Sequence, residues 1–296
     1  MAKEQRRHLA NAPGPWFVDD SCIDCDASRQ CAPELFGSVA GQSVVVRQPG
    51  TAVELAAAMR ALLACPTASI GVTGPKPPAA GLFPQVIEGG VHYCGYNSPQ
   101  SYGANAFFVA REGGNLLIDA PRWVPDLARR IEAFGGIRHL LLTHQDDVAD
   151  ADRYAAHFGA RVWIHEADRG AAPFATDVIE GGEEITIAPD LLAIPAPGHT
   201  RGSVVYLLEQ RYLFSGDSLY WSREQDDLSA FHEQCWFSWE EQARSLERLL
   251  KHEFEWVLAG HGDRRRAEAS EMRERLRALV TRMTTKSGEW WSEIGW

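Results

Sequence analysis

The sequence has no long apolar run and is short of basic residues. No stretch of about 18 consecutive apolar side chains occurs in its 296 residues, so no segment is expected to span a membrane. Lysine and arginine number 29 against 40 aspartates and glutamates, which gives a net charge of -11. This excess of negative charge argues against a nucleic-acid partner, because phosphate binding needs a basic face.

The N-terminus also lacks the apolar segment of a secretory signal. Residues 1–8 are largely charged or polar, and no apolar segment follows them. We therefore expect a cytoplasmic location. In that compartment the six cysteines are expected to be thiols or metal ligands rather than disulfides.

The residues that are present predict two folded units. A hydrophobic content of 45% is enough for a sizeable core. Residues 1–16 are expected to form a flexible lead-in, residues 17–75 a small α+β unit, and residues 76–90, with several prolines, a linker. In residues 91–296, short apolar strands alternate with helical segments, and some neighbouring strands are joined as hairpins. This order favours a layered α/β domain with a mixed sheet.

Four short stretches between residues 143 and 262 each place a metal-type ligand at a turn. They are Thr-His at His144, Gly-His-Thr at His199, Ser-Gly-Asp at Asp217 and Gly-His-Gly at His261. Three of them follow an apolar run of the kind that forms a buried strand. Rigid scaffolds bring ligands together at strand tips where glycine lets the backbone turn. The four side chains therefore predict one metal site.

Three aspartates follow His144 and compete for a role in this site. Asp146 has the same parity as His144, so on an extended segment both side chains point to the same side. This favours Asp146 over Asp147 as a ligand. Asp150 is a candidate ligand or general base, although an acidic run at this point can also cap the helix that follows.

With these motifs the chain resembles the metallo-β-lactamase-fold superfamily, whose usual signature is T-H-x-H-x-D-H, then G-H-T, S-G-D and G-H. The resemblance covers roughly residues 90–296. It implies an αββα sandwich, here preceded by the small α+β unit. The first motif departs from the family: Asp146 stands where the second His is expected, Asp150 matches the family's Asp after a two-residue insertion, and Ala151 replaces the last His.

The resemblance implies a hydrolase that acts on a small-molecule ester, thioester, amide or phosphoester. One or two divalent ions, zinc or else iron or manganese, would activate water for the attack. One ion would be held by His144, Asp146 and His199, with Asp217 as a bridge. A second, weaker ion would be held by Asp150 and His261 together with the bridge.

Two other functions remain open. His144, His199 and Asp217 alone form the two-histidine, one-carboxylate triad of mononuclear non-haem iron oxygenases. Alternatively, the missing ligands are what a degenerate binding module would show. Asp146, Asp150 and His261 favour hydrolysis, since an oxygenase needs only the triad.

The N-terminal cysteines resemble those of a single-cluster bacterial-type ferredoxin. Cys22 and Cys25 are spaced as C-x2-C, and Cys65 precedes a proline. Ser28 stands where the third cysteine is expected. Either Cys31, three residues on, or the Ser28 oxygen could supply the fourth ligand of a 4Fe–4S cluster. We expect Cys31, because thiolate is a softer donor than a hydroxyl. A cluster would fit a redox partner, whereas a vestigial fold with free thiols is the alternative.

Overall fold

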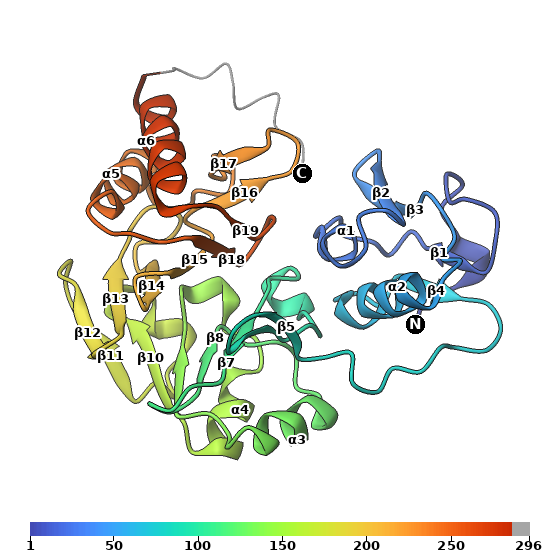
Figure 1. Cartoon of the computed structure of the whole chain (residues 1–296), viewed down its shortest axis with the longest axis horizontal. Coiled ribbons are helices and arrows are strands. Elements are labelled where there is room, and N and C mark those ends of the chain that lie inside the picture. Colours follow the sequence, from blue (N-terminus) through green and yellow to red (C-terminus); the bar gives the residue numbers. More distant parts are fainter. Residues whose placement is uncertain (286–296) are drawn as a thin grey trace.

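Two β-sheets packed face to face form the centre of the larger unit (Figure 1). The computed structural model describes residues 1–285, and residues 286–296, the end of the expected larger domain, lie outside the described residues. The first sheet has seven strands in the order β11-β10-β9-β8-β7-β6-β5. These strands are β5 (Gln85–Glu88), β6 (Val91–Tyr93), β7 (Phe107–Val109), β8 (Leu116–Ile118), β9 (His139–Leu141), β10 (Arg161–His165) and β11 (Asp177–Ile179).

The second sheet has six strands in the order β12-β13-β14-β15-β18-β19. They are β12 (Ile185–Ala188), β13 (Leu191–Pro195), β14 (Val204–Leu208), β15 (Tyr212–Gly216), β18 (Trp256–Ala259) and β19 (Arg265–Arg266). A small hairpin, β16 (Tyr220–Ser222) and β17 (Asp227–Ser229), follows β15. Both large sheets mix parallel and antiparallel pairs, as the interleaved sequence pattern predicts.

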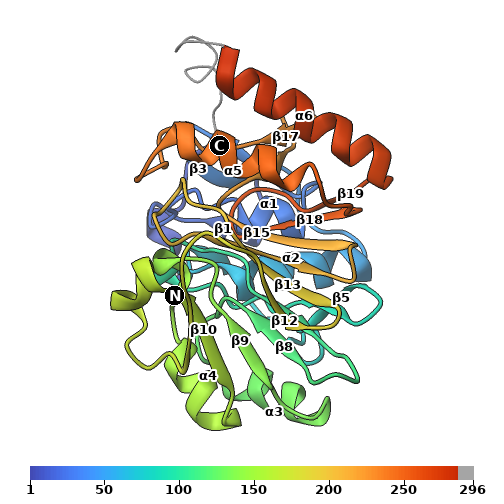
Figure 2. The same cartoon turned by 90° about the vertical axis from the view of Figure 1, so that its left-hand side faces the viewer.

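Helices cover the outer face of each sheet, so the layers run helix, sheet, sheet, helix (Figure 2). The helices are α3 (Pro125–Ala133) and α4 (Ala151–Phe158) on one side, and α5 (Trp239–Leu249) and α6 (Ala269–Thr285) on the other. Strand β14 shows why this order is stable. Val204, Tyr206 and Leu208 pack between the sheets, while Val205 and Leu207 pack toward α5 and α6. A strand buried on both faces needs this unbroken apolar run.

The N-terminal unit follows the order β-α-β-β-α-β around its own apolar core. Its elements are β1 (Trp16–Val18), α1 (Ala27–Cys31), β2 (Phe36–Val39), β3 (Gln42–Val45), α2 (Ala52–Ala64) and β4 (Ile70–Val72). Strand β1 pairs with β4, and β2 pairs with β3. Thr51 and Glu54 form a capping box that fixes the start of α2.

Two expected boundaries differ from the structure. The segment expected to be a linker contains β5, which joins the edge of the seven-stranded sheet. The segment expected to be a flexible lead-in is tied to the N-terminal unit, since the amides of Lys3, His8 and Ala12 donate to Asp19, Val18 and Val45. Backbone hydrogen bonds made with later residues are not visible in composition, which is why polar sequence alone suggested a loose segment.

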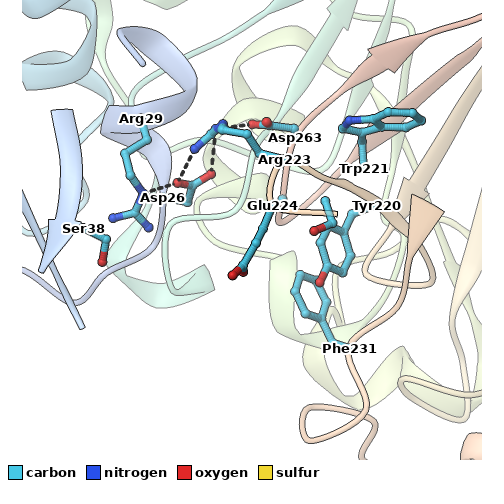
Figure 3. A pocket seen from close by; sticks show the side chains of 11 residues that line it. Asp26, Arg29, Ser38, Tyr220, Trp221, Arg223, Glu224, Phe231 and Asp263 are labelled. Atoms are coloured by element: carbon cyan, nitrogen blue, oxygen red, sulfur yellow. Dashed lines mark hydrogen bonds and ion pairs between the residues drawn. The ribbon is translucent and has the colours of Figure 1, made fainter. Parts of the chain in front are cut away.

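Hydrogen bonds and an ion pair join the two units. The Tyr102 hydroxyl donates to the Ile23 carbonyl at 2.8 Å. Arg223 lies between Asp26 of the N-terminal unit and Asp263 of the larger one, and contacts both (Figure 3). The cysteine loop is therefore held against the edge of the sandwich.

Within residues 1–285, no helix is long and apolar enough to cross a membrane.

Candidate metal centre

The predicted ligands lie on loops that leave the strands of both sheets. His144 follows β9, and His199 lies between β13 and β14. Asp217 follows β15, and His261 follows β18. Because β15 and β18 are parallel neighbours, their ends meet at one edge of the sheet and bring Asp217 beside His261. All four side chains are buried.

The first group of ligand atoms has the spacing of a metal site. The Oδ2 atom of Asp217 lies 3.7 Å from His144 Nε2 and 3.8 Å from His199 Nε2. Asp146 Oδ2 lies 4.0 and 3.4 Å from the same two nitrogens. Ligands about 2.1 Å from a tetrahedral ion are about 3.4 Å from one another, so small adjustments would fit these four atoms around one ion. Within residues 1–285, the buried Nε2 atom of His144 has no hydrogen-bond partner, as is expected of a metal-facing nitrogen.

A second group shares Asp217. Ligand atoms of Asp147, Asp217 and His261 lie within 4.8 Å of one another. His261 Nδ1 is 2.9 Å from Asp217 Oδ2. Both carboxylate oxygens of Asp147 are buried, and neither has a hydrogen-bond partner among the described residues. Gly260 permits this approach, since a Cβ there would lie 2.7 Å from Asp217 Oδ1 and 2.9 Å from Asp147 Oδ2. The arrangement can therefore hold two cations that share one carboxylate.

The structure places Asp147, rather than Asp150, in the second ligand group. Within residues 1–285, Asp150 belongs to neither group, and its Oδ2 accepts a hydrogen bond from Trp123 N at 2.5 Å. Asp147 occupies the position in the second group that was expected for Asp150. The parity argument assumed an extended backbone, but residues 145–147 form a 3-10 turn, η3 (Gln145–Asp147). In a 3-10 turn side chains repeat every three residues, which returns Asp147 to the side of His144.

Burial and neighbouring charges both shift the pKa values of the site residues, and on Asp217 they act in opposite directions. Burial lowers the pKa of the His144 imidazole to about 4, so this histidine is neutral and able to bind a cation at neutral pH. Burial also acts to raise the pKa of Asp217, but His261, His144 and His199 outweigh it and hold that pKa far below its usual range. For Asp147, burial and the neighbouring Asp217 raise the pKa well above normal. Such an excess of buried carboxylate is what a bound cation would neutralise.

A relay of hydrogen bonds from Asp119 through Thr143 orients the imidazole of His144 on its Nδ1 side. The amide and the hydroxyl of Thr143 donate to the two carboxylate oxygens of Asp119, at 2.8 and 2.9 Å. The same hydroxyl is 2.9 Å from His144 Nδ1. A hydroxyl that donates to Asp119 can only accept from Nδ1–H, which leaves the Nε2 lone pair facing the site. Burial raises the pKa of Asp119 to about 8.

A second buried aspartate ties the loops of the two histidines together. Asp168 accepts from Gln145 N at 3.0 Å, beside His144. It also accepts from Thr200 Oγ1 at 2.6 Å and Gly202 N at 3.0 Å, beside His199. Asp119 could have been identified from the sequence as a candidate, because it directly follows the apolar run of β8. Asp168 lies in a polar stretch that gives no comparable sign.

A cavity of about 540 Å³ opens onto both ligand groups. Aromatic and amide side chains supply much of its wall beyond the ligands: Gln100, Tyr102, Phe231, Gln234 and Trp236. Trp236 is 64% exposed, and its ring centroid lies 6.3 Å from that of His199. A cavity with these dimensions and a mixed wall is typical of a small-molecule site.

The predicted cysteine ligands are not all in one place. Cys22, Cys25 and Cys65 line a narrow cavity together with Ser28. Cys31 does not line it; its thiol instead interacts with Tyr93 of β6, in the larger unit. Burial raises the pKa of Cys25 to about 12, and the thiols of Cys65 and Cys22 contribute to the rise.

Two family models match the chain. The one described as metallo-beta-lactamase superfamily matches residues 91–281, more than half of the chain. The one described as 4Fe-4S single cluster domain of ferredoxin I matches residues 18–72. The predicted αββα fold with a small N-terminal unit is confirmed.

Similar proteins were found among curated sequences and solved structures. The hydroxyacylglutathione hydrolase of Acidiphilium cryptum (strain JF-5) is 34% identical over 119 residues, which cover 39% of this chain and 49% of that protein. That of Anaeromyxobacter dehalogenans (strain 2CP-C) is 34% identical over 122 residues, covering 39% and 46%. The chain thus spans about half the length of the curated relatives it matches.

The likeness to solved structures concerns the fold. The DIM-1 metallo-beta-lactamase is 16% identical with a TM-score of 0.51, covering 66% of this chain and 95% of that one. TMB-1 is 17% identical with a TM-score of 0.54, covering 68% and 97%. At these identities the arrangement of layers is shared, and the chemistry has to be argued from this chain's own residues.

Proposed function

Because the chain belongs to the metallo-β-lactamase superfamily, we propose that it is a metal-dependent hydrolase of a small-molecule thioester or ester. The observation that carries this is the pair of ligand groups sharing Asp217 at the floor of one cavity. Among the bonds that such a site can cleave, a thioester is favoured by the relatives. Their name, hydroxyacylglutathione hydrolase, denotes cleavage of a glutathione thioester.

The two ligand groups would hold two ions of unequal strength. His144, Asp146, His199 and Asp217 offer four donors to the first, two of them imidazole nitrogens. Asp147, Asp217 and His261 offer three to the second. A site with two carboxylates suits zinc, iron or manganese. We propose tight binding at the first position and weaker binding at the second.

Bound ions would polarise the scissile carbonyl and lower the pKa of water. The chain's own residues perform the remaining tasks. Asp217 holds the imidazole of His261 through contacts of 3.0 and 2.9 Å with its Nδ1 atom. Asp146, whose side chain is 44% exposed, stands at the cavity mouth, within reach of water and substrate. Trp236 and Phe231 offer apolar surface to the acyl group or the leaving group.

An iron oxygenase using His144, His199 and Asp217 is the competing function. These three atoms do converge, so the triad geometry is available. Asp146 Oδ2, however, lies 3.4 Å from His199 Nε2, where it would occupy a position that an oxygenase leaves open to oxygen. The additional carboxylate of Asp147 also has no task in such an enzyme. Hydrolysis uses both.

The test compares activity with metal content. The full chain is stripped of metal, loaded separately with zinc, manganese and iron(II), and assayed for thiol release from acyl thioesters alongside oxygen uptake with thiols. We expect thiol release in the absence of oxygen, and its loss in His199→Ala and Asp217→Asn. His157→Ala, at a half-exposed histidine of α4 paired with Glu132, is the matched control. Turnover that requires iron(II) and consumes oxygen would favour the oxygenase instead.

We also propose that the N-terminal unit binds an iron–sulfur cluster. Support comes from the match of residues 18–72 to a single-cluster ferredoxin family and from the three thiols that face one cavity. A cluster there would exchange electrons with a redox partner. Visible absorption after anaerobic reconstitution, with iron and sulfide counted, tests this, and a chain without a charge-transfer band would contradict it.

A further inference from the structure

The cavity of the N-terminal unit is lined by three thiols and by hydroxyls from several segments, those of Ser28, Ser43, Thr67 and Ser69. Cys22 and Cys25 lie on the loop before α1, Ser28 lies in the first turn of α1, and Cys65 is the residue after α2. Ser28 is buried, as are Cys25 and Cys65. The fold therefore places three thiols around one cavity, and among the hydroxyls there Ser28 is the one at the position where the cysteine spacing expects a ligand.

Backbone amides point at two of the sulfurs. Asp24 N and Ser43 N each lie 3.4 Å from Cys22 Sγ, and Ser69 N lies 3.3 Å from Cys65 Sγ. Hydrogen bonds of this kind stabilise ligating thiolates and tune the cluster that they hold. The six cysteines, all in the part of the chain that the structure describes, form no disulfides. This donor set fits an iron–sulfur cluster.

Cys31 is the thiol that sequence spacing favours as the fourth ligand, but it faces elsewhere. It is the last residue of α1, and its side chain interacts with Tyr93, near Arg60 and Arg264. Arg264 in turn stacks over the ring of Tyr93, 4.9 Å from its centroid. Cys31 therefore belongs to the contact between the two units, and turning it toward the other cysteines would mean rebuilding α1.

Ser28 is held in place as a ligand would be. Its hydroxyl donates to Ser43 Oγ at 3.0 Å, and Arg29 Nη1 donates to the same oxygen at 2.9 Å. Arg29 is itself fixed by ion pairs with Asp24 and Asp26, on the loop that carries Cys25 (Figure 3 shows its contact with Asp26). The orientation of the Ser28 oxygen is thus set by a buried network rather than by solvent.

We propose that Cys22, Cys25 and Cys65 hold three irons of a four-iron cluster and that Ser28, in place of Cys31, faces the fourth. This inference rests on the proposal that the N-terminal unit binds a cluster. Oxygen is a harder donor than thiolate, so the iron beside Ser28 is held less tightly than the other three. The cluster has one labile corner, fixed by the identity of a single residue.

The expected reaction is loss of that iron on oxidation. With ferricyanide as the oxidant, [4Fe–4S]2+ gives up one electron and splits into [3Fe–4S]+ and Fe2+, while ferricyanide becomes ferrocyanide. The three thiolates stay bound to the remaining irons, and the Ser28 oxygen takes up a proton from water and returns as a hydroxyl to its contact with Ser43. The three-iron product has an odd number of electrons, so it is visible by electron paramagnetic resonance, whereas the starting cluster is not.

The experiment compares the full-length chain with Ser28→Cys, Ser28→Ala and Cys31→Ala after anaerobic reconstitution. Iron, sulfide and the paramagnetic resonance signal are measured before and after ferricyanide. We expect the unaltered chain and Cys31→Ala to fall from about four irons to about three and to gain the signal. Ser28→Cys should keep about four irons, and Ser28→Ala should hold about three from the start.

The outcomes separate the ligand assignment from the presence of a cluster. Loss of the cluster in Cys31→Ala, with native far-ultraviolet circular dichroism and normal metal content at the His144 site, would overturn the choice of Ser28. So would a Ser28→Ala variant that behaves like the unaltered chain. A cluster absent from all four proteins, Ser28→Cys included, would overturn the proposed cofactor as well, while leaving the hydrolytic site untouched.

Discussion

Replacing Asp119 by asparagine should weaken metal binding without touching any ligand. The side chains have nearly the same shape, and an asparagine oxygen can still accept from Thr143 N, now at 2.8 Å from Asp119 Oδ1. Its amide nitrogen, however, would donate to the Thr143 hydroxyl, which donates to Asp119 when that carboxyl is ionised. The hydroxyl would then donate to His144 Nδ1 and leave the imidazole proton on Nε2, the atom that faces the site.

The expected size of this effect follows from the relay. Changes to groups that orient a ligand typically reduce metal affinity 10- to 100-fold, which is about 1.4–2.7 kcal/mol. Affinity is measured by titrating the metal-free protein against a competing chelator. Asp126→Asn, at the surface of α3, is the matched control. Unchanged affinity in a folded Asp119→Asn protein would refute the relay.

The same relay predicts a pH dependence. Burial raises the pKa of Asp119 to about 8 in the metal-free protein, so near neutral pH the carboxyl is largely protonated and resembles asparagine. Metal binding must then expel this proton, and affinity should rise as pH increases toward 8 and beyond. Asp119→Asn has no such proton, so its affinity should depend less steeply on pH. Equal slopes for the two proteins would contradict the assignment.

Three further substitutions test other parts of the structure. Gly260→Ala places a Cβ 2.7 Å from Asp217 Oδ1, so titration should show the second ion lost before the first; two ions bound as before would contradict this. Gly103→Ala places a Cβ 2.8 Å from Cys25 Sγ at a φ of +91°, so iron–sulfur content should fall while the metal content of the His144 site stays constant. Trp236→Ala removes an exposed aromatic wall of the cavity and should raise KM several-fold with little change in kcat, whereas a fall in kcat alone would place Trp236 elsewhere in the mechanism.

The sequence by itself determined the class of fold and the main ligands to examine. Apolar runs separated by helical segments predicted the layered domain, because the period of a buried strand differs from that of an amphipathic helix. His144, His199, Asp217 and His261 were singled out because each stands at a turn, mostly beside glycine. The structure brings these four together. Local sequence patterns are enough to identify these ligands because the end of a strand depends on residues close to it in the sequence.

Only the tertiary structure decided which neighbours of these residues take part. Asp147 lies with Asp217 and Asp150 does not, since a single 3-10 turn changes which side chains point inward. Ser28 lines the cysteine cavity and Cys31 does not, although Cys31 is the better donor. In both pairs the candidates are three residues apart, so spacing could not separate them. The choice depends on the backbone path and on contacts with distant segments, such as that of Cys31 with Tyr93.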